Sequence, residues 1–271
     1  MSRIAVQCVG LALGLGLGGP VAGHSGAAAV EPPAKPSTVV GRLDAHAGIA
    51  STEIGARRVW VLLPPGYDAA RRYPVVYAQD GQDLFDAALA AGGEEWALDE
   101  LLAARPPGIP ELLVVGIEAA PEAMRDYSPP GNMDGARGEE YVRFVAEVVK
   151  PFVDGKYATR SGPESTFTLG CGAGAVIALY AAWTRPETFG GAMALELPDL
   201  DRASLAWLDK RPAVGRPRLW IEQPVGDAAR PSATAMLEAL RAGAEVHYIL
   251  GTRVSSRVTL AAAGLRALLT E

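Results

Sequence analysis

The sequence has few residues of the kinds that build metal sites. Among 271 residues there are three His and two Cys, which argues against a zinc site with several protein ligands. Positive charge is also scarce: 25 Lys and Arg oppose 31 Asp and Glu, and the net charge of −6 leaves no basic stripe for nucleic-acid phosphates. The sequence therefore predicts no metal site, no cofactor and no nucleic-acid partner.

Low-complexity composition is lacking as well. The 31 Gly and 21 Pro residues are together fewer than in low-complexity chains, whereas hydrophobic residues make up 49%. This composition excludes disordered and fibrous proteins. A chain of this length can bury roughly 70–75% of its extended surface, so one large domain is expected.

The first 23 residues predict a secretory signal peptide. Arg3 supplies the positive start, residues 4–19 are apolar and Gly-rich, and residues 20–23 are suited to cleavage, with 27–29 as a second possible cut. A membrane anchor is the alternative, but this apolar run is shorter than the ~20 residues that a span needs. We therefore expect a secreted or periplasmic protein with no stable membrane span after leader removal.

Cleavage would leave a flexible, Ala/Pro-rich lead-in at residues 24–38 and a single domain at residues 39–271. Cys8 would leave with the leader, and its early position makes it a poor acceptor for a lipid. Cys171 would then be the one remaining cysteine, which excludes an internal disulfide.

Short apolar runs alternate with helical patterns along the expected domain. Residues 74–78 and 112–117 are typical of buried parallel strands, and residues 139–157 repeat apolar side chains at helical spacing, with a kink expected at Pro151. Further strands are expected at 39–45, 57–63, 166–169, 192–197, 218–222 and 246–250, and further helices at 96–104, 175–184, 232–242 and 258–269. This alternation predicts an α/β fold with a mostly parallel central sheet and helices on both faces.

A glycine-rich turn, Gly170-Cys171-Gly172-Ala173-Gly174, joins an expected strand to the next expected helix. In α/β-hydrolases, a Gly-x-Ser-x-Gly turn at this place presents the nucleophile. Gly170 and Gly174 occupy the outer positions, where the turn is sharp and the helix packs closely. The middle position, Gly172, has no side chain.

The chain resembles the putative-esterase family of α/β-hydrolases, which includes enterochelin-esterase-like and S-formylglutathione-hydrolase-like enzymes. The resemblance covers about residues 57–190 and rests on several motifs in the same order. The matching stretches are 59–68 (VWVLLPPGYD), 73–77 (YPVVY), 80–86 (DGQDLFD), 125–129 (RDYSP), 138–141 (GEEY), 150–152 (KPF), the glycine-rich turn, 179–181 (LYA) and 186–190 (PETFG). The resemblance implies the α/β-hydrolase fold and an ancestry in serine-dependent ester hydrolysis.

The same resemblance implies that the reactive groups are missing. The family serine corresponds to Gly172, and the family histidine, in a Gly-x-x-His arrangement after the last strand, corresponds to Val254. Asp227 fits the position of the family acid loosely and is interpreted as a remnant. Without a hydroxyl no acyl-enzyme forms, and without an imidazole no group with a pKa near neutrality moves the proton.

A binding pocket could persist after this loss. The resemblance implies an oxyanion hole from the backbone N–H groups near Gln82 and of Ala173, although a turn kept for the fold alone is an equal alternative. Arg125 and Tyr127 resemble a family Arg-x-Tyr beside the cleft, where the arginine would clamp a carboxylate; a salt bridge and a packed ring are slightly favoured instead. Trp96 resembles a tryptophan near the family pocket, and core packing also explains it.

Substitutes for the missing groups are weighed in the same way. Cys171 lies one position before Gly172, and a buried inert thiol is favoured over a nucleophile. His247 lies inside an expected strand, and a packed or partly exposed imidazole is favoured over a base. His46 is expected to be exposed in a turn, and the acidic run within residues 94–100 is interpreted as a solvated face.

Three functions remain open. The first is a secreted esterase-family homologue that has lost catalysis and binds a small ester, acid or sugar-like ligand, or a protein partner. The second is an active carboxylic-ester hydrolase with a non-standard constellation, such as water activated by Asp227 and His247. The third is a structural or interaction module of the cell envelope. Gly172 and Val254 favour the first and third functions over the second. A cleft that is open and polar around Gln82, Arg125 and Tyr127 would favour the first over the third.

Overall fold

The structure is a computed structural model that describes residues 36–201, 204–210, 215–224, 231–251 and 256–269. The expected signal peptide, nearly all of the lead-in, Asp227 and Val254 lie outside these residues. Within the described ranges, no helix combines the length and the apolar character needed to cross a bilayer.

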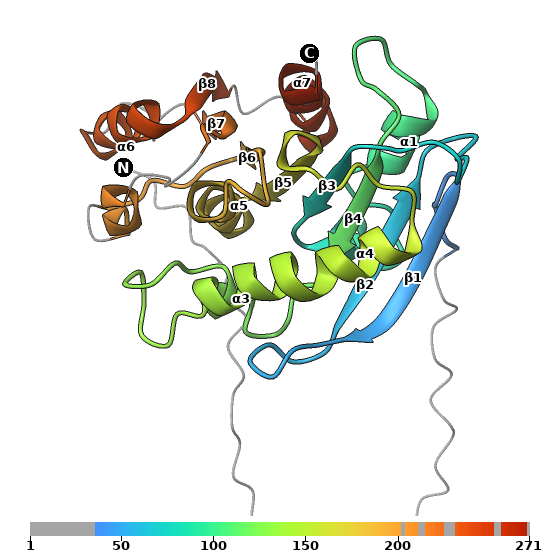
Figure 1. Cartoon of the computed structure of the whole chain (residues 1–271), viewed down its shortest axis with the longest axis horizontal. Coiled ribbons are helices and arrows are strands. Elements are labelled where there is room, and N and C mark those ends of the chain that lie inside the picture. Colours follow the sequence, from blue (N-terminus) through green and yellow to red (C-terminus); the bar gives the residue numbers. More distant parts are fainter. Residues whose placement is uncertain (1–35, 202–203, 211–214, 225–230, 252–255, 270–271) are drawn as a thin grey trace, which may run out of the picture. The chain divides into compact units, whose positions relative to one another are not determined.

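A sheet of eight strands runs through the described part of the domain in the order β1-β2-β4-β3-β5-β6-β7-β8 (Figure 1). The strands are β1 Arg42–Ile49, β2 Arg57–Leu63, β3 Val75–Ala78, β4 Leu113–Ile117, β5 Thr166–Cys171, β6 Gly191–Leu195, β7 Arg218–Pro224 and β8 Glu245–Gly251. β2 pairs antiparallel with β1 and β4, and the other neighbouring strands are parallel. The prediction of a mostly parallel sheet is confirmed.

Helices alternate with the strands along the chain. They are α1 Leu98–Ala103, α2 Ala123–Asp126, α3 Gly138–Phe144, α4 Lys150–Lys156, α5 Ala173–Thr184, α6 Pro231–Gly243 and α7 Arg257–Leu269. Short 3₁₀ turns occur at η1 Gly81–Asp83, η2 Ala91–Gly93, η4 Pro163–Ser165 and η5 Ala206–Asp209.

The central strands are buried on both faces of the sheet, whereas the edge strands β1 and β8 are largely exposed or half-buried. Successive side chains of a strand point to opposite sides, so one strand contributes to two apolar clusters. In β2, Val59 and Val61 join one apolar cluster, whereas Trp60 and Leu62 join the other. The first cluster includes side chains of α3, α4, α5 and α6, and the second includes side chains of α1 and α7. Helices therefore cover both faces, as predicted.

The helix expected at residues 139–157 is present as α3 and α4, joined by the π-helical segment η3 Val145–Val149 (Figure 1). Pro151 comes two residues after this segment and has no N–H to donate to the carbonyl of Glu147. We attribute the wide π turn to this missing hydrogen bond, and the chain stays helical through it.

His46 differs from its expected place in an exposed turn, because β1 continues to Ile49. The imidazole is half-buried, lies 2.6 Å from the Tyr157 hydroxyl and packs edge-on against the ring of Phe152. Burial, followed by the positive charge of Lys156, lowers the pKa of His46. The imidazole is therefore part of the packing between β1 and α4.

Candidate functional site

Gly172 forms the apex of the turn between β5 and α5. Its φ and ψ are 57° and −121°, a backbone conformation that favours glycine. The Gly172 N–H donates to the Leu195 carbonyl at 3.0 Å, and the Gly172 carbonyl accepts from Ala175 at 3.0 Å. The apex is thus bound to the end of β6 on one side and to the first turn of α5 on the other.

Gly170 and Gly172 differ in how much space surrounds them. A Cβ atom at Gly170 would lie 2.0 Å from the carbonyl oxygen of Gly174, so no side chain fits there. A Cβ atom at Gly172 would meet no atom within 4 Å apart from those of its two chain neighbours. The outer glycine is therefore required by packing, whereas the apex faces open space.

Backbone donors remain at this edge of the sheet. Ala173 is the first residue of α5, so its N–H has no intrahelical acceptor, and no described residue accepts a hydrogen bond from it. Gln82 lies in η1, which follows β3, and its side-chain oxygen accepts from the Ala119 N–H at 3.0 Å. The backbone N–H of Gln82 also has no acceptor among the described residues. Both N–H groups remain available for the oxyanion role that the resemblance implies.

Cys171 is engaged by a neighbouring carboxylate. Its thiol donates to Glu196 Oε2 over 3.2 Å. Burial, followed by the negative charge of Glu196, raises the pKa of the Cys171 thiol to about 12. Because only the thiolate is a competent nucleophile, this geometry matches the favoured interpretation of an inert thiol.

Glu196 connects three elements at the same edge. It follows β6 with a φ of 48°, and its N–H donates to Glu222 Oε2 at 2.7 Å. Its Oε1 accepts from Arg257 Nε at 3.4 Å, and that guanidinium lies over the Trp96 ring at 5.6 Å. The sequence analysis did not single out Glu196, Glu222 or Arg257. The available signal was a carboxylate at or just beyond the carboxyl end of two buried strands.

Asp80 places a second carboxyl group beside the turn. It follows β3 in the left-handed conformation, with φ 56°, and its Oδ1 accepts from the Tyr127 hydroxyl at 3.1 Å. Its Oδ2 lies 3.2 Å from the position that a Cβ atom of Gly174 would take. Burial raises the pKa of Asp80 to about 6, against the opposing effect of the Tyr127 hydrogen bond. A carboxyl group with a raised pKa therefore lies beside the first turn of α5.

Arg125 and Tyr127 have separate surroundings. Tyr127 is buried, packs edge-on against Tyr141 at 5.4 Å and reaches the site through its hydrogen bond to Asp80. Arg125 is exposed on α2, and its guanidinium lies beside Gly135 without an ion pair to any described residue. Tyr127 therefore fits the packed-ring alternative, whereas Arg125 lacks the salt bridge.

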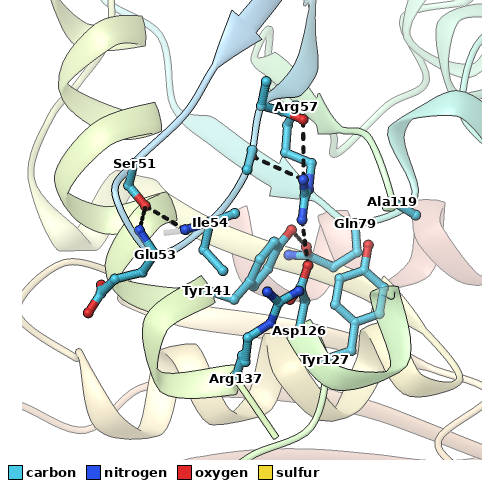
Figure 2. Close-up of polar contacts among 12 residues, drawn as sticks. Ser51, Glu53, Ile54, Arg57, Gln79, Ala119, Asp126, Tyr127, Arg137 and Tyr141 are labelled. Carbon is cyan, nitrogen blue, oxygen red and sulfur yellow. Dashed lines mark hydrogen bonds and ion pairs between the residues drawn. The ribbon is translucent and has the colours of Figure 1, made fainter. Parts of the chain in front are cut away.

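The salt bridge belongs instead to Asp126. Figure 2 shows its carboxylate between Arg57 and Arg137, with oxygen–nitrogen distances of 2.6 and 2.7 Å. Both Asp126 and Arg57 are buried, and the hydroxyl of nearby Tyr141 donates to Gln79. This network ties Asp126 of α2 and Arg137 before α3 to β2, and the Tyr141 hydroxyl of α3 contacts Gln79 just after β3.

Trp96 is 4% exposed and packs in the apolar cluster of α1 and α7, with its backbone N–H donating to the Asp83 carbonyl at 2.8 Å. His247 is an exposed residue of β8, 3.5 Å from Glu245. It precedes Gly251, the last residue of β8, by four positions, or roughly 13 Å along the strand. His247 is therefore a partly exposed strand residue, as favoured.

The acidic run is not wholly solvated. Asp99 is 1% exposed, and one of its oxygens accepts from the Val40 N–H at 2.6 Å. Burial raises the pKa of Asp99 to about 7. Carboxylate oxygens of Glu95, Asp99 and Glu100 lie within 4.8 Å of one another, a spacing that could hold a cation. An acidic cluster alone does not establish a metal site, and the interpretation as a solvated face is wrong for Asp99.

Sequence and structure comparisons identify similar proteins. The sequence profile of the family described as "Putative esterase" matches residues 51–239. The protein YjcH of Bacillus subtilis is 30% identical over 144 residues, which are 52% of this chain and 55% of YjcH. The chain thus spans about half the length of this curated relative.

Solved structures share the fold at low sequence identity. An IroE-like serine hydrolase from Shewanella oneidensis superimposes with a TM-score of 0.62 at 19% identity, over 83% of this chain and 79% of that one. The enterobactin esterase FES of Shigella flexneri, solved in the presence of 2,3-dihydroxy-N-benzoyl-serine, gives a TM-score of 0.62 at 18% identity. That alignment covers 84% of this chain and 59% of FES.

Proposed function

The chain belongs to the putative-esterase family of α/β-hydrolases, and from this premise we propose that it is a secreted member that has lost ester hydrolysis and binds a small acid or ester. The observation that carries the proposal is the apex of the glycine-rich turn. Gly172 keeps the sharp backbone conformation, and open space lies where a nucleophile would stand.

The described thiol and imidazole groups supply neither a ready nucleophile nor a ready base beside Gly172. The Cys171 thiol is hydrogen-bonded to Glu196 and has a pKa of about 12. His247 lies away from the carboxyl end of β8, and His46 packs against α4. The interpretation of Val254 as the histidine position supports the same conclusion from the sequence.

Binding would use what remains after the loss of the reaction. The unpaired N–H groups of Ala173 and Gln82 are donors for a carbonyl or carboxylate oxygen. Gly172 has no side chain, and a Cβ atom there would meet no atom within 4 Å apart from those of its chain neighbours, so the apex itself leaves room for a ligand. These N–H groups could polarise the carbonyl of a bound ester, but no side chain at residue 172 could attack it.

Two measurements test the loss of hydrolysis. The purified full chain should show negligible turnover of p-nitrophenyl acetate and butyrate and no labelling by a fluorophosphonate probe. The single variant Gly172→Ser should stay inactive, whereas Gly172→Ser combined with Val254→His should gain ester turnover. Wild-type turnover at ordinary enzymatic rates would refute the proposal. Inactivity of a folded double variant would show that the histidine position is placed wrongly.

A binding experiment tests the retained role. We use 2,3-dihydroxy-N-benzoyl-serine as the probe, because FES was solved in its presence. Calorimetry should detect binding to the wild type and its loss in Gly172→Leu, which fills the open space. Gly155→Leu is the control, because a Cβ atom at Gly155 in α4 would also meet no atom within 4 Å apart from those of its chain neighbours and its own helix backbone. Equal affinities in all three proteins would show that the ligand does not bind at the glycine-rich turn, which would contradict this part of the proposal.

A separate experiment tests whether the protein is secreted. Expression of the full chain in a bacterial host should deliver the mature protein to the periplasm, with an N-terminus at or shortly after residue 23. Retention of Met1 on the purified protein would contradict this part of the proposal.

One observation favours the alternative of an active enzyme with a non-standard constellation. Asp80 titrates near pH 6 beside the turn, which is suitable for a general base that activates water. Under this alternative the wild type hydrolyses activated esters slowly, the rate rises with pH through about 6, and Asp80→Asn abolishes it. A rate unaffected by Asp80→Asn removes the alternative.

A further inference from the structure

A cavity of about 620 Å³ lies at the amino ends of the parallel strands, whereas Gly172 lies at their carboxyl ends. Its wall includes Tyr73 and Pro74 before β3, Ser165 and Phe167 around the start of β5, and Arg218 at the start of β7. Gly172 follows the carboxyl end of β5, so the two regions lie at opposite ends of the parallel strands. Any ligand of this cavity is separate from the candidate esterase site.

Four arginines line the cavity: Arg71, Arg72, Arg160 and Arg218. The lining also contains Glu111 and Glu164, so these side chains carry a formal excess of two positive charges. The whole chain, by contrast, has a net charge of −6. Positive charge is therefore concentrated around this cavity, although the whole chain is negatively charged.

Three of the four arginines lack a carboxylate partner among the described residues. Arg72 Nη1 donates to the Ala69 carbonyl at 3.2 Å, and Arg160 Nε donates to the Arg72 carbonyl at 3.2 Å. Arg218 Nη2 donates to the backbone carbonyl of Glu164 at 3.3 Å. These contacts orient the guanidinium groups but leave their charge uncompensated, because a backbone carbonyl carries no net charge.

Glu111 does not compensate them either. Its two carboxylate oxygens face Arg71 at 2.7 Å and Arg105 at 3.5 Å, so its single negative charge is shared between two guanidinium groups. Among the described residues, Arg72, Arg160 and Arg218 form no ion pair, so their remaining N–H groups stay available to an anion.

Aromatic rings hold two of the arginines in place. The Arg71 guanidinium lies 5.1 Å from the centre of the Tyr73 ring, and the Arg218 guanidinium lies 5.2 Å from the centre of the Phe167 ring. Both rings are 1% exposed. A guanidinium stacked on a buried ring keeps fewer orientations, which lowers the entropy cost of binding a planar or tetrahedral oxyanion.

We propose that this cavity binds a soluble organic molecule bearing a phosphate group, through Arg72, Arg160 and Arg218. Arginine pairs with phosphate through two parallel N–H···O bonds, and three unpaired guanidinium groups match the charge of a phosphate ester or diphosphate. The volume exceeds that of inorganic phosphate and falls within the usual range for small-molecule sites, roughly 300–1,000 Å³. The organic part of the ligand would occupy the remainder.

The test is titration of the full chain with pyrophosphate and glucose 6-phosphate, followed by calorimetry at low and at moderate salt. We expect saturable binding of both probes, weakened by salt. Arg160→Gln with Arg218→Gln should weaken it at least about tenfold, the loss expected for charge-assisted hydrogen bonds.

Arg58→Gln is the control, because Arg58 is exposed like Arg160, stacked on an aromatic ring (at 5.6 Å) like Arg218, and without an ion pair to a described residue. It should leave both affinities unchanged. Circular dichroism and thermal unfolding establish that each variant is folded. Absence of binding to the folded wild type, or equal weakening by Arg58→Gln, would overturn the proposal.

A vesicle experiment distinguishes a lipid headgroup from a soluble phosphate. Co-sedimentation with phosphatidylcholine vesicles containing phosphatidic acid should recover no more protein than phosphatidylcholine alone. Retention on the acidic vesicles that is lost in Arg160→Gln with Arg218→Gln would replace the soluble ligand with a membrane surface.

Discussion

The Cys171 thiol donates a hydrogen bond to the Glu196 carboxylate across the carboxyl ends of β5 and β6. This pairing ties the one sulfur next to the apex of the turn to a carboxylate that also faces Arg257. The contact explains why the Cys171 thiol is not a ready nucleophile although it lies next to Gly172.

Thiol alkylation should be slow for this reason. In a Cys8→Ser background at pH 8, we expect iodoacetamide to modify Cys171 more than about a hundredfold more slowly than free cysteine, because a thiol with a pKa of about 12 is almost entirely protonated. Glu196→Gln removes the negative charge and should speed the reaction, whereas Glu245→Gln on β8 should not. A wild-type rate equal to that of free cysteine would contradict the assignment.

The two glycines of the turn should differ in their tolerance of alanine. Gly172→Ala places a side chain in open space, so its cost is backbone strain alone, about 1–3 kcal/mol of unfolding free energy. Gly170→Ala puts a methyl group 2.0 Å from a carbonyl oxygen and should destabilise much more or prevent folding. Urea denaturation of both variants measures the difference. Similar costs at the two positions would mean that the packing of β5 against α5 is looser than described.

Removing the buried anion between two arginines should be costly. Asp126→Ala leaves the buried guanidinium of Arg57 without a counter-charge, and we expect a loss of about 3–5 kcal/mol in unfolding free energy. The control is Glu53→Ala, which breaks a solvent-exposed pair with Arg143 and should cost less than about 1 kcal/mol. Equal effects of the two substitutions would argue against a structural role for the network.

Stability should fall as pH rises through the range in which Asp99 ionises. Its pKa in the folded chain is about 7, above the ordinary value of 3.8, so the folded state binds more protons than the unfolded state between these values. The contribution of Asp99 is therefore favourable at low pH and is lost between about pH 4 and 7. Asp99→Asn should flatten the decline in unfolding free energy between about pH 4 and 7, measured in urea. Asp134→Asn, an exposed carboxyl elsewhere, should leave the decline as it is.

Local patterns in the sequence were sufficient for the sheet and for the glycine-rich turn. The apolar run at Val75–Ala78 is buried on both faces, and the Gly170–Gly174 spacing reports a close strand-to-helix approach. Both features depend on neighbouring residues in the chain, which is why a single sequence reveals them.

The polar contacts of the site depend on residues far apart in the chain. Arg57 and Asp126 are 69 positions apart, and Cys171 and Glu196 are 25 apart, so no local pattern pairs them. Asp99 of α1 accepts a hydrogen bond from the Val40 N–H, 59 positions away. The acidic composition of residues 94–100 gives no indication of this contact, so the sequence predicted an exposed carboxylate. Asp227 and Val254 stay predictions, because they fall outside the described residues.

The shape of the turn is maintained by atoms that take no part in ester chemistry. Gly170 closes against Gly174, and the apex is fastened to Leu195 and Ala175 through its backbone. The turn can therefore keep its conformation whether or not residue 172 carries a hydroxyl group. Selection for folding alone would preserve the contacts that stabilise it. Among relatives of this chain, an intact turn is therefore poor evidence of an intact enzyme.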